Sequence, residues 1–103
     1  MALQDAANTK GEDIPSEAAL PLGAATGVLV NVTGTTNITS ISEAPAGVER
    51  KIIFDGVLTI VHNAVSLINL GGVDIVTVAG DTAEFRSLGG GNWQMFDYSR
   101  ASG

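Results

Sequence analysis

Residues 48–80 constrain the fold more strongly than any other part of the sequence. They hold three apolar runs, rich in β-branched side chains, which Gly, Asn and Asp separate at short intervals. No window keeps the period of about 3.6 residues that a helix of about ten residues would show. Short runs of this kind are typical of a small all-β sandwich or barrel. The three runs are 52–54, 57–61 and 73–78.

Alternation of apolar and polar side chains predicts further strands on both sides of this segment. Residues 28–33 are the clearest case, because Val28, Val30 and Val32 face one way and polar side chains mostly face the other. The pattern predicts a small antiparallel sandwich or barrel-like domain, and no repeat period of the length of a solenoid coil is apparent. The strands expected outside the central segment are 18–22, 28–33, 38–41, 82–88 and 92–99.

The pair Asp55-Gly56 is the strongest local turn signal. It lies between residues 48–54, which alternate, and the apolar run 57–61. Asp-Gly favours the type I′ turn that joins two paired strands. We therefore expect a β-hairpin at this position.

The last expected strand, residues 92–99, carries aromatic side chains on both faces. Strict alternation places Trp93 on one face and Phe96 and Tyr98 on the other. A strand that is apolar on both faces is expected to be covered on both, one of them by a neighbouring subunit. Trp93, Phe96 and Tyr98 are therefore the predicted subunit interface.

The length of 103 residues fits one domain, which is preceded by a polar segment. Residues 1–17 carry four carboxylates against one lysine and show no apolar period. This segment is either a solvated tail or an extended arm that becomes ordered against a partner. The predicted division is an extended N-terminal arm, 1–17, and a β domain, 18–103. The arm residues expected to contact the partner are Leu3, Asp5, Lys10 and Ile14.

Composition narrows the classes of partner. The net charge is −6 with five basic residues in no stripe, which disfavours nucleic acid. Only five residues are aromatic and 16% are charged, so the core is thin and burial against copies of the same chain is favoured. No apolar run approaches the ~20 residues that span a bilayer, and the first residues lack a secretory signal. We expect a soluble protein made in a cytoplasm, without a membrane partner.

No catalytic or metal-binding constellation stands out in the sequence. There is no cysteine, and the single histidine, His62, follows an apolar strand, where a hydrogen-bonded structural role is expected. Glycine runs match no phosphate-binding motif. We therefore expect no enzyme, no metal and no cofactor. A polysaccharide hydrolase or lyase would need a carboxylate pair. The candidates for such a pair are Asp55, Asp74, Asp81 and Asp97.

Several short pieces, spread from about Gly11 to the C-terminus, share a pattern of turn glycines between strands. They are LGAATG (22–27), VNVTGTTNIT (30–39), FDGVLT (54–59), HNA (62–64), AGDTAEF (79–85), GNW (91–93) and YSRA (98–101). As a set, these pieces resemble a module common in structural proteins of tailed bacteriophages.

The resemblance implies a role in a virion. Such modules occur at the ends of tail-fibre-like proteins and as small free-standing virion proteins. A start at Met1 with only a short arm, and no shaft, favours a capsid decoration (cement) protein. Proteins of similar role form homotrimers on the capsid exterior and pin the major capsid protein with an N-terminal arm, after synthesis in the host bacterial cytoplasm. The alternative is a tail-fibre tip that binds a host surface through the loops 42–47 and 89–91.

Overall fold

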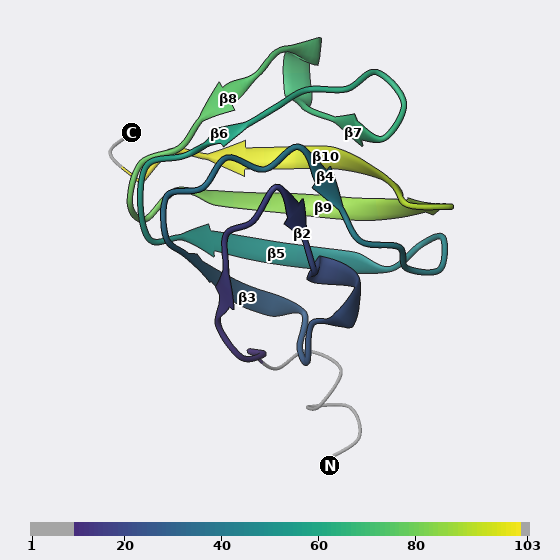
Figure 1. Cartoon of the computed structure of the whole chain (residues 1–103), viewed down its shortest axis with the longest axis horizontal. Coiled ribbons are helices and arrows are strands. Elements are labelled where there is room, and N and C mark those ends of the chain that lie inside the picture. Colours follow the sequence, from purple (N-terminus) through teal and green to yellow (C-terminus); the bar gives the residue numbers. More distant parts are fainter. Residues whose placement is uncertain (1–9, 102–103) are drawn as a thin grey trace.

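The computed structural model describes residues 10–101 and shows an all-β protein, as predicted (Figure 1). The two helical segments, η1 (Leu22–Ala24) and η2 (Leu70–Gly72), are single 3-10 turns. All the other regular elements of residues 10–101 are strands. These are β1 (Ile14–Pro15), β2 (Ala19–Leu20), β3 (Leu29–Thr33), β4 (Ser40–Ile41), β5 (Glu49–Phe54), β6 (Thr59–Ile60), β7 (Leu67–Ile68), β8 (Ile75–Val76), β9 (Thr82–Gly89) and β10 (Asn92–Ser99).

A curled six-stranded sheet forms the larger layer, in the order β1-β3-β5-β9-β10-β7. Its centre is antiparallel, because β9 pairs with both β5 and β10. Both flanks are parallel, since β3 pairs in parallel with β1 and β5, and β7 with β10. The sheet is therefore mixed, which corrects the antiparallel part of the prediction and leaves the all-β class confirmed.

The second layer consists of short strands that lie over the curled sheet (Figure 1). Parallel β2 and β4 form one pair, antiparallel β6 and β8 form another, and a parallel bridge between Ile38 and Ile60 links the two pairs. From β1 to β6 the chain passes back and forth between the layers. Successive strands β1, β3 and β5 pair in parallel in one layer, and in the other β2 pairs in parallel with β4, which the Ile38–Ile60 bridge links to β6. The first half is thus coiled like a short solenoid, which the sequence did not indicate.

The hairpin expected at Asp55-Gly56 is not formed. The run 57–61 crosses to the second layer, where β6 pairs with β8, whereas β5 stays between β3 and β9. Gly56 is absent from the glycines with positive φ, although a type I′ turn requires positive φ there. The backbone N–H of Asp55 donates to the carbonyl of Val32 instead. Because β5 has partners on both sides, the run 57–61 cannot pair with it.

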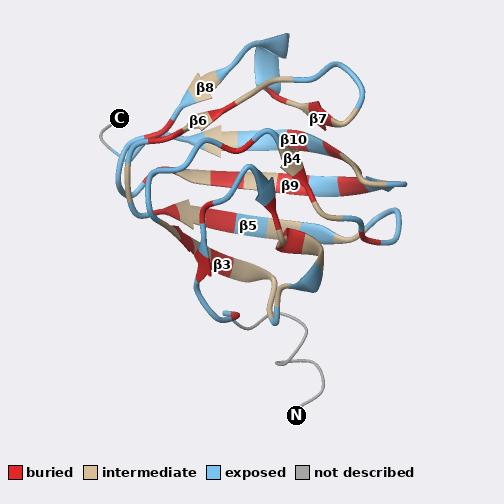
Figure 2. Cartoon of the chain, viewed as in Figure 1, coloured by how far each residue is buried: buried red, intermediate tan, exposed pale blue. Residues whose placement is uncertain are grey.

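The core lies between the two layers, and buried positions alternate along the strands (Figure 2). Trp93 is fully buried and its indole N–H donates to the carbonyl of Ser42 in the opposite layer, at 2.9 Å. The turn between β9 and β10 uses Gly89, Gly90 and Gly91, all with positive φ, as expected for a glycine run. The largest buried side chains are Trp93, Phe54, Phe85, Leu20, Leu22, Ile38, Ile52, Ile60, Leu67, Met95, Val30 and Val32.

Candidate functional site

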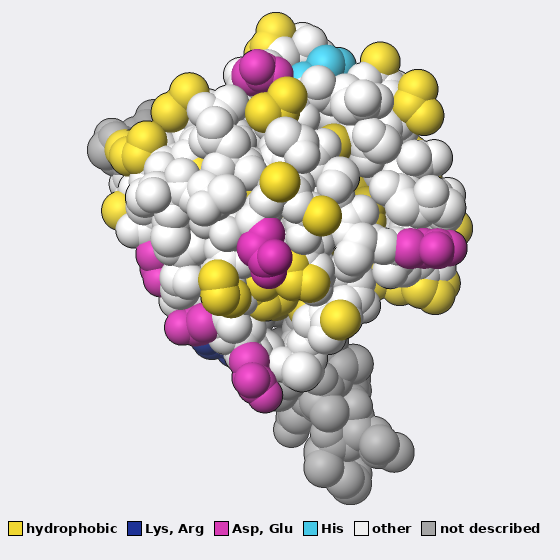
Figure 3. Space-filling view, in the orientation of Figure 1, with side chains coloured by type: hydrophobic (Ala, Val, Ile, Leu, Met, Phe, Trp, Pro, Cys, Tyr) yellow, Lys and Arg dark blue, Asp and Glu magenta, His cyan; other side chains and the backbone are white. Residues whose placement is uncertain are grey.

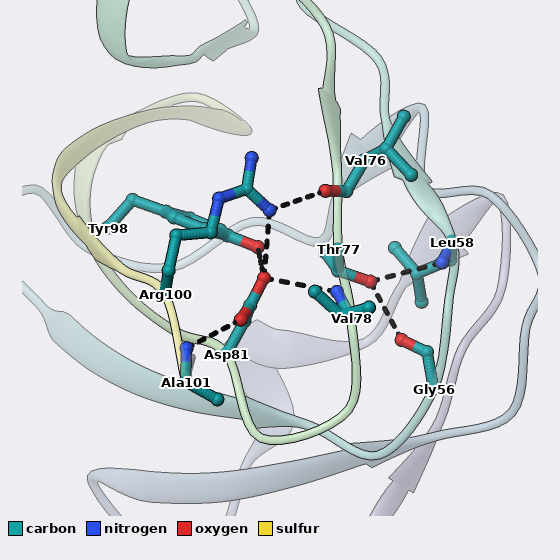
Figure 4. Close-up of polar contacts among 9 residues, drawn as sticks. All are labelled: Gly56, Leu58, Val76, Thr77, Val78, Asp81, Tyr98, Arg100 and Ala101. Atoms are coloured by element: carbon teal, nitrogen blue, oxygen red, sulfur yellow. Dashed lines mark hydrogen bonds and ion pairs between the residues drawn. The ribbon is translucent and has the colours of Figure 1, made fainter. Parts of the chain in front are cut away.

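The most elaborate polar arrangement surrounds Asp81, in the turn between β8 and β9 (Figure 4). The Asp81 side chain is fully buried. Its Oδ2 accepts hydrogen bonds from the Val78 N–H at 3.0 Å, the Tyr98 hydroxyl at 2.7 Å and the Arg100 Nη1 at 2.9 Å. Its Oδ1 accepts from the Ala101 N–H at 2.8 Å. We call these five residues the Asp81 cluster.

The protonation of the Asp81 cluster follows from its hydrogen bonds. Burial by itself would raise the pKa of Asp81, but the N–H of Ala101, the Tyr98 hydroxyl, the N–H of Val78 and Arg100 together lower it from 3.8 to about 2. Burial and the neighbouring carboxylate raise the pKa of Tyr98. Asp81 is therefore an ionised acceptor and Tyr98 a neutral donor at neutral pH. A carboxylate with every oxygen engaged is a structural lock rather than a general base.

The Asp81 cluster also joins the two layers of the fold. Arg100 Nη1 donates to the carbonyl of Val76 on β8 at 2.8 Å, and its guanidinium lies 4.9 Å from the centroid of the Tyr98 ring. Nearby, the buried Thr77 hydroxyl donates to the carbonyl of Gly56 and accepts from the N–H of Leu58 (Figure 4). These contacts fasten β6 and β8 to the end of β10.

His62 has the structural hydrogen bonds expected for it. Its Nδ1 accepts from the N–H of Asn69 at 3.1 Å, and its backbone N–H donates to Asp74 Oδ1 at 2.8 Å. The buried Asn69 amide donates to the carbonyls of Ile60 and Val73 and so holds the loop containing η2 against β6. Asn69 was not singled out in the sequence, because a lone asparagine beside a Leu-Gly-Gly turn looks like an ordinary loop residue.

The four carboxylates considered for acid–base chemistry occupy different settings. Asp81 is locked, Asp74 accepts from the backbone of His62, and Asp55 and Asp97 are exposed. Within residues 10–101, no group of three or more His, Cys, Asp or Glu is placed to hold a metal ion.

The predicted arm is part of the domain from Lys10 onwards. Lys10 forms a bridge to Leu29 and an ion pair with Asp13 at 2.9 Å, and Ile14 lies in β1, where it is 9% exposed and joins the core. Residues 10–17 of the predicted arm therefore belong to the described β domain. Leu3 and Asp5, the other predicted arm contacts, lie outside the described residues.

The predicted aromatic interface is corrected by a β-bulge. The register of β10 against β9 shifts between Met95 and Asp97, so the bulge at Phe96 inverts the alternation. Tyr98 therefore shares the inner face with Trp93, and it stacks on the buried ring of Phe54 at 6.4 Å. Trp93 is fully buried by its own chain, and Tyr98 is half-buried. Of the three predicted interface residues only Phe96 faces outward; it is 36% exposed and lies under the guanidinium of Arg86.

A hollow of about 230 Å³ lies at the end of the fold opposite β7, where β1 and β2 are the edge strands of their layers. Its walls are mostly apolar, and two carboxylates belong to it. It adjoins Lys10 and Gly11, where the described chain begins and Gly11 bonds to Leu29. The lining residues are Glu12, Asp13, Ile14, Pro15, Pro21, Ala24, Ala25 and Thr26.

The two loops considered for host-surface binding lie side by side. The N–H of Gly47 donates to the carbonyl of Ser87, and the Ser87 hydroxyl donates to the carbonyl of Ala44 at 2.7 Å. A Cβ on Gly89 would lie 3.5 Å from that of Ala46. Loops 42–47 and 89–91 therefore form one surface, at the right-hand end of Figure 1.

Charge is distributed unevenly over the surface. Asp and Glu side chains are spread over the face in Figure 3, on which Lys and Arg hardly appear.

Neither 3-10 turn of residues 10–101 has the length and apolar character needed to cross a membrane. Comparison with family models, with curated proteins and with solved structures finds no match to this chain.

Proposed function

We propose that the protein is a capsid decoration (cement) protein of a tailed bacteriophage. It binds as a homotrimer to the outside of the head lattice and stabilises the shell of the major capsid protein. The support from sequence is the resemblance of residues 11–103 to phage virion modules. The observation that carries the proposal is the end formed by β1 and β2, where two edge strands and a mostly apolar hollow adjoin the start of the described chain.

This end has the features of a protein-binding surface. Edge strands and concave apolar surface are common sites of contact between chains. Pro15 in β1 offers no N–H, so side-chain contacts in the hollow are favoured over addition of a strand. The described chain begins at Lys10, two residues before Glu12 in the wall of the hollow, so a contact made by the preceding residues and one made by the hollow can involve the same partner. The protein then stabilises the head by binding alone.

The test is a deletion of residues 2–9, with residues 10–103 kept. The deletion stops before Lys10 because Ile14 is part of the core and a longer deletion would damage the fold. We expect unchanged far-ultraviolet circular dichroism and solution mass, and loss of binding to purified heads in a sedimentation assay. Asp97→Asn, a change at an exposed position far along the chain, is the control and should bind normally. Saturation of heads by the truncated protein would refute the arm mechanism.

A second candidate is the tip of a tail fibre that binds a host surface. The observation in its favour is the contact between loops 42–47 and 89–91, which forms one surface from two segments. Fluorescently labelled protein that adheres to host cells and leaves heads undecorated would select this function. Gly90→Asp should then reduce adhesion, because Gly90 has open space around it at the loop tip and the change leaves the core intact.

A further inference from the structure

The ribbon of β6 and β8 exposes a row of valines. Thr59 pairs with Val76, and the buried side chains of Leu58 and Ile60 point into the core. The residues that alternate with them therefore point outward. We call this surface the valine face. It consists of the exposed Val57, Val76 and Val78 and the half-buried Thr59 and Val61.

The exposure of the valine face is high for apolar side chains. Val57 is 53% exposed, Val76 54% and Val78 44%. None of its five residues is charged, although the chain has a net charge of −6. At one end Asp74 accepts a hydrogen bond from the backbone of His62.

The outer face of the six-stranded sheet has a different character. It carries the ion pairs Lys51–Glu84 and Arg86–Glu49, and Arg86 also lies over the ring of Phe96. Charged side chains therefore cover much of the surface around Phe96, the one predicted interface residue that points outward. Of the two outward surfaces, the valine face has the lower cost of desolvation.

The backbone at the edge of β8 is already engaged. The carbonyl of Val76 accepts from Arg100, and the N–H of Val78 donates to Asp81. A partner strand would have to displace these bonds, so strand addition along β8 is disfavoured. The valine face is thus suited to contact through side chains.

We propose that the valine face is where copies of this chain contact one another. The inference rests on the proposed function, to which it assigns the surface that forms the homotrimer. Two copies of net charge −6 repel each other, so they associate best through a surface with few carboxylates, and the valine face has Asp74 only at one end. A basic partner would instead be drawn to the carboxylate-bearing surfaces. In a closed three-fold ring the contacts are head-to-tail, so opposite edges of the valine face of neighbouring copies meet around the shared axis.

The test is the solution mass of the whole chain by light scattering after size exclusion, over a range of concentrations. The wild-type protein should approach three times 10.5 kDa. Val76→Asp should reduce the mass to that of one chain, and Val76→Thr, of the same shape, should weaken association at least tenfold. Val65→Asp is the matched control, because Val65 is 66% exposed but lies outside the ribbon. Circular dichroism verifies the fold of each variant.

Salt gives an independent readout. Added salt screens the repulsion between acidic copies and leaves apolar contact intact, so association should strengthen from 50 mM to 500 mM salt. Weakening over this range would overturn the proposal, because it would indicate contact through ion pairs. A wild-type chain that is monomeric at every concentration, or a Val76→Asp variant of unchanged mass, would overturn it as well. If the wild-type chain is monomeric and binds heads, and Val76→Asp abolishes this binding, the valine face docks on the shell and the self-contact is refuted.

The two proposals fail separately. A trimer that depends on Val76 but leaves heads undecorated retains the self-contact and refutes the decoration function. If the chain decorates heads and the Val76→Asp variant keeps the wild-type mass, the decoration function is retained and the self-contact is refuted.

Discussion

Replacement of Asp81 by asparagine tests the structural lock directly. The side chain is fully buried, and its two oxygens accept from Val78, Tyr98, Arg100 and Ala101. An amide keeps the shape, but one of its two terminal groups becomes a donor. At least one existing donor then faces another donor, and the charge opposite the guanidinium is lost.

The cost can be worked out from the pKa. A fall in the pKa of Asp81 from 3.8 to about 2 corresponds to about 2 kcal/mol of folding stability at neutral pH. Arg100 is 48% exposed, so solvent screens its share, and the N–H groups of Ala101 and Val78 and the Tyr98 hydroxyl supply most of this. An unsatisfied buried donor adds about 1–3 kcal/mol. We expect Asp81→Asn to lower the free energy of unfolding by about 3–5 kcal/mol, and each kcal/mol corresponds to about 4–8 °C in Tm.

The pH dependence separates this mechanism from a general packing defect. The folded pKa lies below the unfolded one, so Asp81 contributes fully above about pH 4 and its contribution is lost as the pH falls to about 2. Thermal unfolding followed by circular dichroism should therefore show a Tm difference between wild type and Asp81→Asn that is large at pH 7 and smaller at pH 2.5. Asp97→Asn, the exposed control, should stay within about 0.5 kcal/mol of wild type. Equal stability at pH 7, or an unchanged difference at pH 2.5, would refute the reasoning.

Two further predictions concern packing. Trp93→Phe leaves the carbonyl of Ser42 without its donor, so the free energy of unfolding from urea titration should fall by about 2 kcal/mol. A loss under about 0.5 kcal/mol would contradict a stabilising role of this hydrogen bond. Gly23→Ala places a Cβ 2.2 Å from the carbonyl oxygen of Glu43 and should cost about 1–3 kcal/mol or more. Gly90→Ala is the control, because its Cβ meets no atom within 4 Å and the change incurs only the strain of a φ of +65°, about 1 kcal/mol. A loss of stability in Gly90→Ala that equals or exceeds the loss in Gly23→Ala would contradict the prediction.

The strands that the sequence predicts best are those with enough residues to show alternation. The pattern of residues 28–33 places Val30 and Val32 in the core, and both are fully buried in β3. The stretch 82–88 likewise corresponds to β9. For such strands the period of two is visible, because one face is buried and the other meets water.

The topology could not be predicted, because it depends on strands of two residues. β1, β2, β4, β6 and β8 are each too short to show a period, and the turns between them differ in length. Parallel pairing between distant segments therefore leaves no regular repeat in the sequence. Asp55-Gly56 was misleading for a related reason, since a local turn preference is weaker than the pairing of β5 with two neighbours.

The polar sites show the same limit. Asp81 in a turn is unremarkable in sequence, and the donors of Tyr98, Arg100 and Ala101 lie 17 to 20 positions further along the chain. Their convergence depends on the bulge at Phe96, which turns Tyr98 inward. An inserted residue in a strand has no reliable sequence signal, so neither the bulge nor the cluster that follows from it could be inferred.

The Asp81 cluster and the valine face are linked through Arg100. Its guanidinium donates a hydrogen bond to the carbonyl of Val76 at the edge of β8. A strand edge with free backbone groups is a template for aggregation, so this hydrogen bond protects the edge. Arg100→Ala should therefore leave the fold largely intact, because Asp81 keeps its other donors, but aggregate faster than wild type when light scattering is followed at 37 °C. Arg86→Ala is the matched control, since it removes the same charge from the outer face of the sheet. Equal aggregation of the two variants would attribute the effect to the loss of a cation. Faster aggregation of Arg100→Ala alone would indicate that the hydrogen bond from Arg100 prevents irreversible strand pairing at the edge of β8. Association through β8 is then restricted to reversible contact between side chains.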